Sequence, residues 1–321
     1  MTTHYGVIGL GPVGAVFAGM LSKAGHRVSV LEREATRADF FRKNALRVGG
    51  KLQAEVMLDH VFTHLDEFLA AKPQVILICT KASQSRDLAR QLKANGAWEE
   101  TTFVCCQNGI DVEDLVSEVF GKHHVLRAVL NLGCNFVKVN EVWVEFCFHH
   151  ILSANPESME MDARICKEFR EAGLDFEVRS EYREDVYRKA ILNTALSTAC
   201  ALTRLTMRQA MSDPEIARMV TEIIRESLLV AEAIKFPTLD RSYQEPALAY
   251  LRQGGDHKPS MLVDIEASRA TENEFHAGAI FRYAQQHGID VPVIQTLYYL
   301  TKNLEKAVVL NRYVVGGMRE L

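Results

Sequence analysis

The chain has 321 residues, 48% of them hydrophobic and 24% charged, which are the proportions of an ordinary soluble globular protein. A net charge of −4 excludes a nucleic-acid partner held by general electrostatic attraction, and no apolar run reaches the length of a membrane span. The length supports a sizeable core and predicts two domains.

Cysteine usage indicates a reducing compartment. The chain has seven cysteines, an odd number, and its sequence contains no Cys-x-x-Cys pair. Several lie in apolar runs, where a reduced cysteine acts as a small hydrophobic residue. We therefore predict free thiols, a cytoplasmic location and no metal site, and we interpret His149 and His150 as structural. The cysteines are Cys79, Cys105, Cys106, Cys134, Cys147, Cys166 and Cys200.

The first half of the chain alternates short apolar runs with amphipathic stretches. This βαβ rhythm predicts an α/β fold of the Rossmann type, a doubly wound parallel sheet covered on both faces. Residues 141–152 alternate more strictly and predict an antiparallel addition. We place a dinucleotide-binding domain at 1–180. The expected strands are 5–10, 27–32, 74–80, 102–107, 124–130 and 174–180, and the expected helices include 12–25, 83–96 and 158–173.

The second half follows a helical period. Asp213 before Pro214 is a plausible N-cap with proline in the first helical position. We therefore predict a C-terminal all-α domain at 181–321 that carries the substrate and catalytic groups. The expected helices are 183–203, 213–234, 245–254, 264–288 and 293–308.

A glycine-rich turn directly follows the first strand and opens the first helix. It reads Gly9-Leu10-Gly11-Pro12-Val13-Gly14. The three glycines suit a tight turn, close approach of a pyrophosphate, and close helix–strand packing, and the helix N-terminus favours an anion. This context predicts dinucleotide binding; the alternative is a glycine turn without a ligand.

Two charged residues at the end of the second strand bear on the choice of cofactor. Glu32 stands where an acid hydrogen-bonds the ribose hydroxyls of NAD, whereas the next residue, Arg33, is able to pair with the 2′-phosphate of NADP. Both signals are present, and either residue also suits a solvated surface.

Three polar residues share one stripe of an otherwise apolar helix in the second half. At about 100° per residue, Lys189, Asn193 and Ser197 fall within about 80° of one another. Burying an unpaired ammonium or amide is costly, so these groups need partners. The stripe indicates either a satisfied structural network or a ligand.

With these features in place, the chain resembles the ketopantoate reductases (2-dehydropantoate 2-reductases) from the glycine loop to about residue 305. Five segments carry the resemblance in the family's order. They are GLGPVG at 9–14, TKASQ at 80–84, QNG at 107–109, KAILN at 189–193 and SMLVDIEASRATE at 260–272.

The resemblance implies roles for the residues that act on the substrate. Lys189 is the implied general acid for the ketone oxygen, with Glu272 beside it at the nicotinamide end. Asn193 and Ser260 are the implied substrate ligands, and Asn108 is implied to touch both substrate and nicotinamide ribose. The site is expected in the cleft between the domains.

The resemblance also implies the cofactor contacts. The glycine loop, Lys81, Asn108 and Glu272 are expected near the cofactor, and Arg33 aligns with the arginine that binds the 2′-phosphate. We therefore expect NADP, with NAD as the alternative because of Glu32. The expected reaction reduces 2-dehydropantoate to pantoate in a monomer or homodimer.

Departures from the family pattern leave the substrate open. Ser197 stands where relatives often have a second substrate asparagine, and Met207-Arg208 replaces an Asn-Gly. These changes favour, as an alternative, a reductase of another branched 2-oxo acid. A dinucleotide-binding sensor without turnover is a further alternative, but it has no need of a proton donor.

The spacing of Ser260 and Glu272 adds a geometric expectation. A continuous helix would separate them by about 18 Å, too far for one small acid. We therefore place Ser260 in the leading turn of its helix, with an N-cap role as the alternative.

Overall fold

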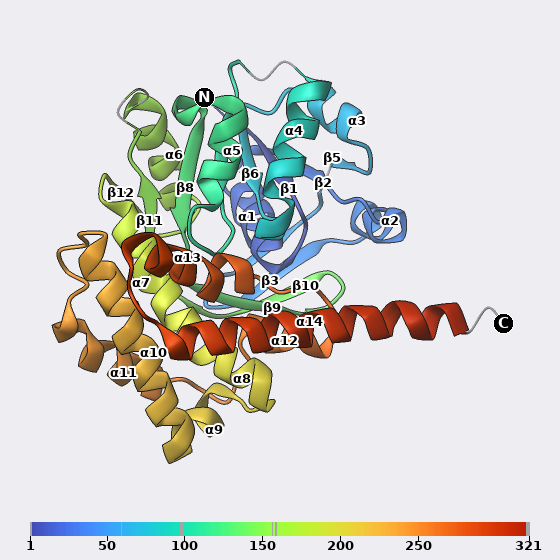
Figure 1. Cartoon of the computed structure of the whole chain (residues 1–321). Helices are drawn as coiled ribbons and strands as arrows, with labels where there is room; N and C mark the ends of the chain where they lie inside the picture. The colour runs from blue at the N-terminus through green and yellow to red at the C-terminus, as the bar shows by residue number, and fades with distance from the viewer. Residues whose placement is uncertain (1, 59, 97–98, 156, 158, 319–321) are drawn as a thin grey trace. The chain divides into compact units, whose positions relative to one another are not determined.

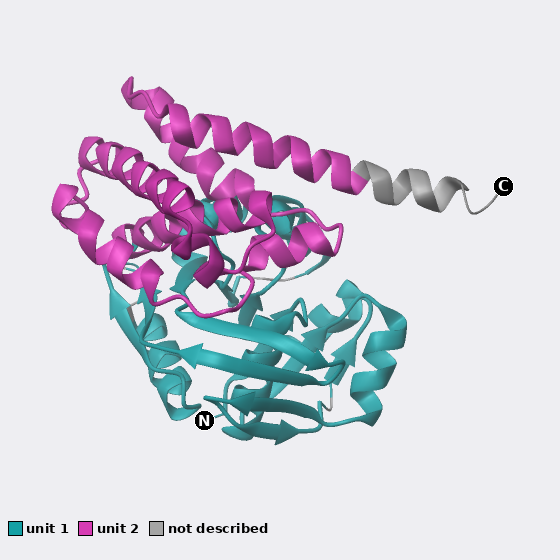
Figure 2. Ribbon diagram, turned by 90° about the horizontal axis from the view of Figure 1, so that it is seen from below, with its two compact units in different colours: residues 1–182 teal, residues 183–321 magenta. Residues whose placement is uncertain are grey.

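The computed structural model describes residues 2–318 apart from residues 59, 97–98, 156 and 158, and it describes the side chains of these residues up to 309, apart from that of residue 159. The chain divides into two compact units, residues 1–182 and 183–321 (Figure 2). Unit 1 combines strands and helices, whereas the described elements of unit 2 are helical. The predicted class, a Rossmann-type α/β domain followed by an all-α region, is confirmed.

In the described part of unit 1, eight strands form one sheet in the order β12-β11-β8-β7-β6-β1-β2-β5 (Figure 1). Neighbouring strands are parallel except β11 and β8, which are antiparallel. The strands are β1 (His4–Ile8), β2 (Arg27–Leu31), β5 (His60–Phe62), β6 (Val75–Ile78), β7 (Thr102–Cys105), β8 (Val125–Val129), β11 (His150–Ser153) and β12 (Phe176–Arg179).

Both faces of this sheet are apolar, so both need a cover of helices. Along β7, Val104 packs into the core that contains α1, while Phe103 and Cys105 pack into the opposite core, as the two-residue period of a strand requires. Helices α1 (Pro12–Lys23), α2 (Ala35–Lys43) and α6 (Met159–Glu171) contribute to the first core, and α3 (Leu65–Ala70), α4 (Ser85–Asn95) and α5 (Val112–Phe120) to the second.

A second sheet, which the sequence did not predict, has the order β4-β3-β10-β9 and packs on α1. The antiparallel pairing predicted for 141–152 is confirmed, but the stretch is not a single addition to one sheet. That stretch forms β10, which pairs with β9, and then β11, which pairs with β8 in the large sheet. The alternation of apolar and polar residues indicates a half-buried strand, but it does not reveal that the chain passes from one sheet to the other within this stretch. The strands are β3 (Leu46–Gly50), β4 (Ala54–Val56), β9 (Leu132–Lys138) and β10 (Glu141–Cys147).

The helices of unit 2 mostly follow the predicted segments. Asp213 caps α10 as expected, because its carboxylate accepts hydrogen bonds from the backbone N–H groups of Glu215 and Ile216. Across the described residues, no helix combines the length and the apolar character of a membrane span. The helices are α7 (Tyr182–Leu192), α8 (Thr198–Thr203), α9 (Met207–Ser212), α10 (Pro214–Ala233), α11 (Gln244–Arg252), α12 (Ser260–Glu266), α13 (Ala277–His287) and α14 (Pro292–Met318).

One helix prediction in unit 2 was wrong, and a second did not include a local irregularity. The segment 264–288 is not one helix, because α12 ends at Glu266 and α13 begins only at Ala277. Ser268 adopts a left-handed conformation with φ of 53°, which no continuous α-helix allows. The segment 183–203 is also not a uniform α-helix, because a π-helical turn, η3 (Asn193–Ser197), interrupts it.

Replacement of Gly14 by alanine is predicted to destabilise unit 1. An added Cβ at Gly14 would lie 2.1 Å from the carbonyl oxygen of Gly9, so α1 would have to move away from β1. Overpacking of this kind costs about 3 kcal/mol or more. Thermal and urea denaturation of Gly14→Ala against the wild type measure the loss.

Gly11→Ala is the matched control. Apart from its own chain neighbours, no atom lies within 4 Å of an added Cβ at Gly11, so the expected loss is only that of an N-cap alanine, about 1 kcal/mol. Equal stabilities of the two variants would contradict the prediction.

Candidate active site

The sequence-predicted residues of unit 1 meet at one edge of the large sheet. The glycine loop follows β1, Glu32 follows β2, Lys81 follows β6 and Asn108 follows β7. These four strands are parallel neighbours, so their carboxyl ends lie at the same edge. The chain continues from β1 to one side of the sheet and later returns to its other side as β6, which makes this edge a topological switch point.

The glycine loop has the geometry of a phosphate cradle. Gly9 has a φ of 94°, and an added Cβ there would come within 2.9 Å of Thr80. Gly11 is the N-cap of α1, so no side chain caps the first turn, and the space beside its Cα is open. Loop backbone and helix N-terminus therefore leave room for an anionic group.

The acid at the end of β2 is already engaged. Glu32 is 9% exposed, and its carboxylate accepts a hydrogen bond from the backbone N–H of Glu34 at 3.1 Å. The same carboxylate forms an ion pair with Arg37 at 2.8 Å. Arg33 is exposed. The sequence interpretation missed Arg37, whose partners lie in a loop and a strand end, where no helical spacing reveals them.

The loop that carries Asn108 is held from below by a buried arginine. Gly109 has a φ of 110°, and its carbonyl oxygen accepts a hydrogen bond from Arg127 at 3.0 Å. Arg127 also forms an ion pair with Glu113 at 3.7 Å, and both side chains are at most 5% exposed. Asn108 itself is half-buried. Arg127 was missed too, although a charged residue in the apolar run 124–130 signals a buried partner.

The loops after β6 and β7 are tied to each other. The side chain of Gln107 donates a hydrogen bond to the hydroxyl of Ser85 at 2.8 Å, and both residues are buried. Ser85 opens α4 just after Lys81, which is the N-cap of a short 3₁₀ turn.

Burial raises the pKa of the Cys105 and Cys106 thiols, so these cysteines stay protonated and are poor nucleophiles.

In unit 2, the lysine and asparagine of the predicted stripe lie on either side of the junction between α7 and η3. Lys189 is in the last turn of α7, Asn193 opens η3 and Ser197 closes it. Lys189 and Asn193 are half-buried, and Ser197 is 9% exposed. Turns with i→i+5 hydrogen bonds occur frequently at functional sites.

Ser260 and Glu272 are not on one helix, so the helical rise does not separate them. Ser260 is the first residue of α12, in its leading turn as expected, and it is exposed. The alternative N-cap role is wrong, because Pro259 is the N-cap and no side chain caps this helix. Helix α12 packs against η3 and α8, so it lies next to the turn that carries Asn193.

Glu272 lies between two anchored neighbours. The backbone N–H of Thr271 donates to Glu305 at 3.0 Å, and the side chain of Asn273 donates to the carbonyl oxygen of Tyr298 at 3.1 Å. Both acceptors belong to α14, so this helix fixes the segment that carries Glu272.

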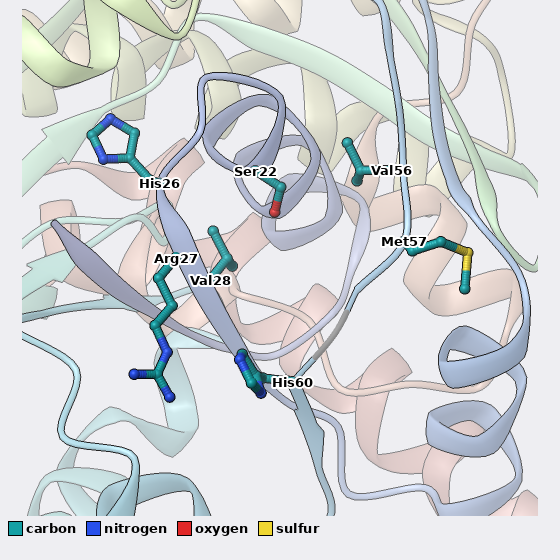
Figure 3. Close-up of a pocket in the computed structure, with 7 residues that line it drawn as sticks. All are labelled: Ser22, His26, Arg27, Val28, Val56, Met57 and His60. Carbon is teal, nitrogen blue, oxygen red and sulfur yellow. The ribbon is translucent and has the colours of Figure 1, made fainter. Parts of the chain in front are cut away.

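A hollow of about 300 Å³ lies at the opposite edge of the large sheet, where β2 and β5 begin (Figure 3). It contains none of the sequence-predicted site residues, although it has two histidines and an arginine. We therefore do not assign it to the site. Its lining consists of Ser22, His26, Arg27, Val28, Val56, Met57 and His60.

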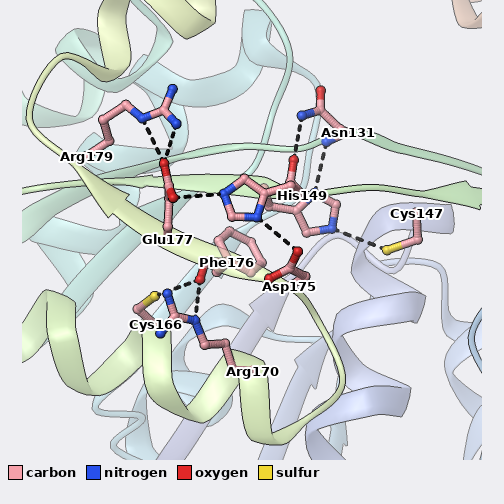
Figure 4. A network of polar contacts seen from close by, with 10 residues as sticks. Asn131, Cys147, His149, Cys166, Arg170, Asp175, Phe176, Glu177 and Arg179 are labelled. Carbon is pink, nitrogen blue, oxygen red and sulfur yellow. Dashed lines mark hydrogen bonds and ion pairs between the residues drawn. The ribbon is translucent and has the colours of Figure 1, made fainter.

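The histidine pair after β10 belongs to a structural network (Figure 4). His149 bridges the carboxylates of Asp175 at 2.9 Å and Glu177 at 3.2 Å. The hydrogen bond from His149 lowers the pKa of Asp175. His150 accepts a hydrogen bond from the backbone N–H of Asn131 at 3.0 Å. Among the described residues, no group of three or more His, Cys, Asp or Glu side chains is arranged to hold a metal ion.

Removal of the arginine below the Asn108 loop is predicted to destabilise unit 1 strongly. Arg127→Met would leave the carboxylate of Glu113 buried without its cation, at a cost of about 3–5 kcal/mol. Urea denaturation measures this cost. The double variant Arg127→Met with Glu113→Gln is expected to recover part of it, because the charge imbalance is removed. A single variant as stable as the wild type would disprove the role of the pair.

Comparison with known proteins identifies a family whose models match most of the chain. A family model described as ketopantoate reductase PanE/ApbA matches residues 5–151, and a second, described as the C terminal of ketopantoate reductase PanE/ApbA, matches residues 181–305. The 2-dehydropantoate 2-reductase of Aquifex aeolicus is 23% identical over 316 residues, covering 95% of this chain and 98% of the relative.

Solved structures show the same fold. The 2-dehydropantoate 2-reductase of Geobacter metallireducens has a TM-score of 0.85 at 21% identity, covering 94% of this chain and 99% of its own. D-mandelate dehydrogenase, in a ternary structure with NADH and anilino(oxo)acetate, has a TM-score of 0.85 at 20% identity, covering 95% and 99%.

Proposed function

The chain belongs to the ketopantoate reductase family of NAD(P)-dependent oxidoreductases, and on this premise we propose that it reduces 2-dehydropantoate to pantoate with NADPH and a proton from Lys189. Two observations together support the proposal. Unit 2 carries Lys189 at the end of α7 and Asn193 at the start of η3. Unit 1 carries a glycine turn that suits a dinucleotide at the switch point of its sheet.

The residues of unit 1 fit a dinucleotide. The open space at Gly11 and the uncapped start of α1 suit a pyrophosphate. Lys81 and Asn108 follow neighbouring parallel strands at the same edge of the sheet and are proposed to contact the nicotinamide half. Arg33, exposed at the end of β2, is proposed to pair with the 2′-phosphate, which favours NADPH. When bound, the cofactor supplies a hydride from C4 of its nicotinamide.

Lys189 is proposed to serve the ketone oxygen. Hydride addition to a 2-oxo acid builds negative charge on this oxygen, and an ammonium group aimed at it stabilises that charge. The Nζ group then transfers a proton to the oxygen, which completes the alcohol. Glu272 is proposed to orient the ammonium group and to make Lys189 part of a paired network, as a half-buried cation requires.

The remaining polar groups of unit 2 are proposed to bind the substrate. Ser260, at the exposed start of α12, is a neutral donor for the substrate carboxylate. Asn193 is the proposed partner of the hydroxyl that 2-dehydropantoate carries beyond its quaternary carbon. Ser197 is shorter than the asparagine found in relatives and reaches that hydroxyl less well or through water.

A second candidate function follows from Ser197 and Met207, which change the polar set of the family pattern. The alternative substrate is another branched or bulky 2-oxo acid, and the reaction and residue roles stay the same.

Steady-state kinetics with 2-dehydropantoate, 2-oxoisovalerate and benzoylformate, each with NADPH and NADH, test the proposal. Benzoylformate belongs in the panel as the 2-oxo acid that corresponds to mandelate. We expect the highest kcat/KM for 2-dehydropantoate with NADPH, and only moderate discrimination against 2-oxoisovalerate because Ser197 is short. Higher kcat/KM for benzoylformate or 2-oxoisovalerate would transfer the assignment to the alternative.

Lys189→Ala is predicted to lower kcat by about 10²–10⁴-fold, the scale of general acid catalysis, with little change in cofactor binding. Lys189→Arg keeps the charge but is a much weaker acid, so its kcat is also expected to be low.

Arg188→Met is the control for Lys189→Ala. Arg188 precedes Lys189 on the same helix but pairs with Glu184 and Thr238, so this variant removes a charge without removing the proposed donor. Normal turnover by Lys189→Ala, or an equal loss in the control, would disprove the role of the lysine.

A further inference from the structure

Arg37 connects the two parts of unit 1 that a dinucleotide's adenosine half would contact. It lies in the first turn of α2. One end of its guanidinium donates to the carbonyl oxygen of Leu10 in the glycine loop at 2.6 Å, and the other pairs with Glu32 at 2.8 Å. Arg37 therefore sits where the phosphate cradle and the end of β2 come together.

This pairing engages both carboxylate oxygens of Glu32. One carboxylate oxygen takes the N–H of Glu34 and the other takes the guanidinium of Arg37, and the side chain is 11% exposed. An acid at this position distinguishes NAD by accepting hydrogen bonds from both ribose hydroxyls. An acid held in an ion pair is a weaker acceptor for them and repels a phosphate less, because Arg37 compensates its charge.

Aromatic rings hold Arg37 in place. Its guanidinium carbon lies 5.4 Å from the ring centre of Phe41 and 5.0 Å from that of Phe136, both within the range of cation–π contacts. Phe41 belongs to α2 and Phe136 to β9 of the small sheet. The planar group is thus positioned before any ligand binds, which lowers the entropy cost of using it.

Arg37 retains donors for a ligand. A guanidinium has five N–H donors, and the contacts with Glu32 and Leu10 use two of them. The side chain is 25% exposed, so part of it is accessible to a ligand. With Glu32 compensated, Arg33 is an additional positive charge at the strand end, and the local charge suits a phosphate dianion.

We propose that Arg37 is a specificity-determining residue for the cofactor: it occupies Glu32 and presents its remaining donors to the 2′-phosphate, and so turns a site with the acid of an NAD enzyme into one that prefers NADPH. The proposal deepens the proposed function and rests on it. Arg33 alone does not explain a preference for NADPH, because Glu32 beside it opposes the same phosphate.

The test measures dissociation constants by titration calorimetry for NADPH, NADH, 2′,5′-ADP and 5′-AMP. Arg37→Met keeps the apolar stem between the two rings and removes the charge. We expect the dissociation constants of NADPH and 2′,5′-ADP to rise about tenfold or more, the scale of a charge-assisted hydrogen bond. Those of NADH and 5′-AMP are expected to stay unchanged or to fall, because Glu32 is released.

Three further variants separate specificity from structure. Arg37→Lys keeps the charge but cannot bridge Glu32 and Leu10, so an intermediate preference is expected. Arg37→Met with Glu32→Gln is expected to regain part of the affinity for NADPH, because the released acid is removed. Lys43→Met removes the same charge from an exposed position at the end of α2 and is expected to leave the ratio of NADPH to NADH affinity unchanged.

If Arg37→Met weakens the binding of NADPH and NADH equally, Arg37 has only a structural role and the proposal is overturned. Unchanged dissociation constants for both dinucleotides would overturn it as well. The outcome for the proposed function is distinguishable. If the wild type binds NADPH with this dependence on Arg37 but reduces no 2-oxo acid, only the substrate assignment fails. If the wild type binds neither dinucleotide, the proposed function and this inference fail together.

Discussion

The contact between the first turn of α1 and the loop after β1 leaves no room for one methyl group at Gly14. Gly19, on the same helix, is also restricted, by Val48 of the small sheet, whose Cγ2 would lie 2.7 Å from an added Cβ. Helix α1 is therefore held closely on two sides, by the large sheet and by the small one. Its N-terminus is fixed at the switch point of the sheet, at the edge where the parallel strands β7, β6, β1 and β2 end beside one another. The position of every proposed cofactor contact in unit 1 depends on this packing.

Two arginines at this edge solve the same physical problem in the same way. Arg37 joins the carbonyl oxygen of Leu10 to Glu32, and Arg127 joins that of Gly109 to Glu113. In each case a loop carbonyl and a carboxylate with little exposure share one guanidinium, which satisfies groups that would be costly to bury alone. The glycine loop and the Asn108 loop are thereby ordered before any ligand arrives, and binding does not have to supply that order.

The sequence predicted the features that depend on neighbours along the chain. Six of the eight strands of the large sheet, α1 and the N-cap at Asp213 follow from local periodicity and turn chemistry, which act over a few residues. It did not predict features that depend on distant partners. Residues 141–153 divide between two sheets because of their pairing with β9 and β8. Helix α12 ends at Glu266, and the segment beyond it is held by the bond from Thr271 to Glu305 of α14. Arg37 was missed for the same reason, since its partners belong to a loop and a strand end.

The π turn at Asn193–Ser197 shows how a local irregularity changes a pattern that was correctly noticed. In an α-helix, with 3.6 residues per turn, a side chain four residues later passes beyond a full turn. A turn closed by i→i+5 hydrogen bonds is wider, so a side chain four residues later falls short of a full turn. The step from Lys189 to Asn193 therefore turns past a full circle, whereas the step from Asn193 to Ser197 stops short of one. The wider turn therefore brings Ser197 back toward the line of Lys189 and Asn193, whereas a uniform helix would spread the three over about 80°. The interruption aligns the polar groups more closely than the sequence alone allowed.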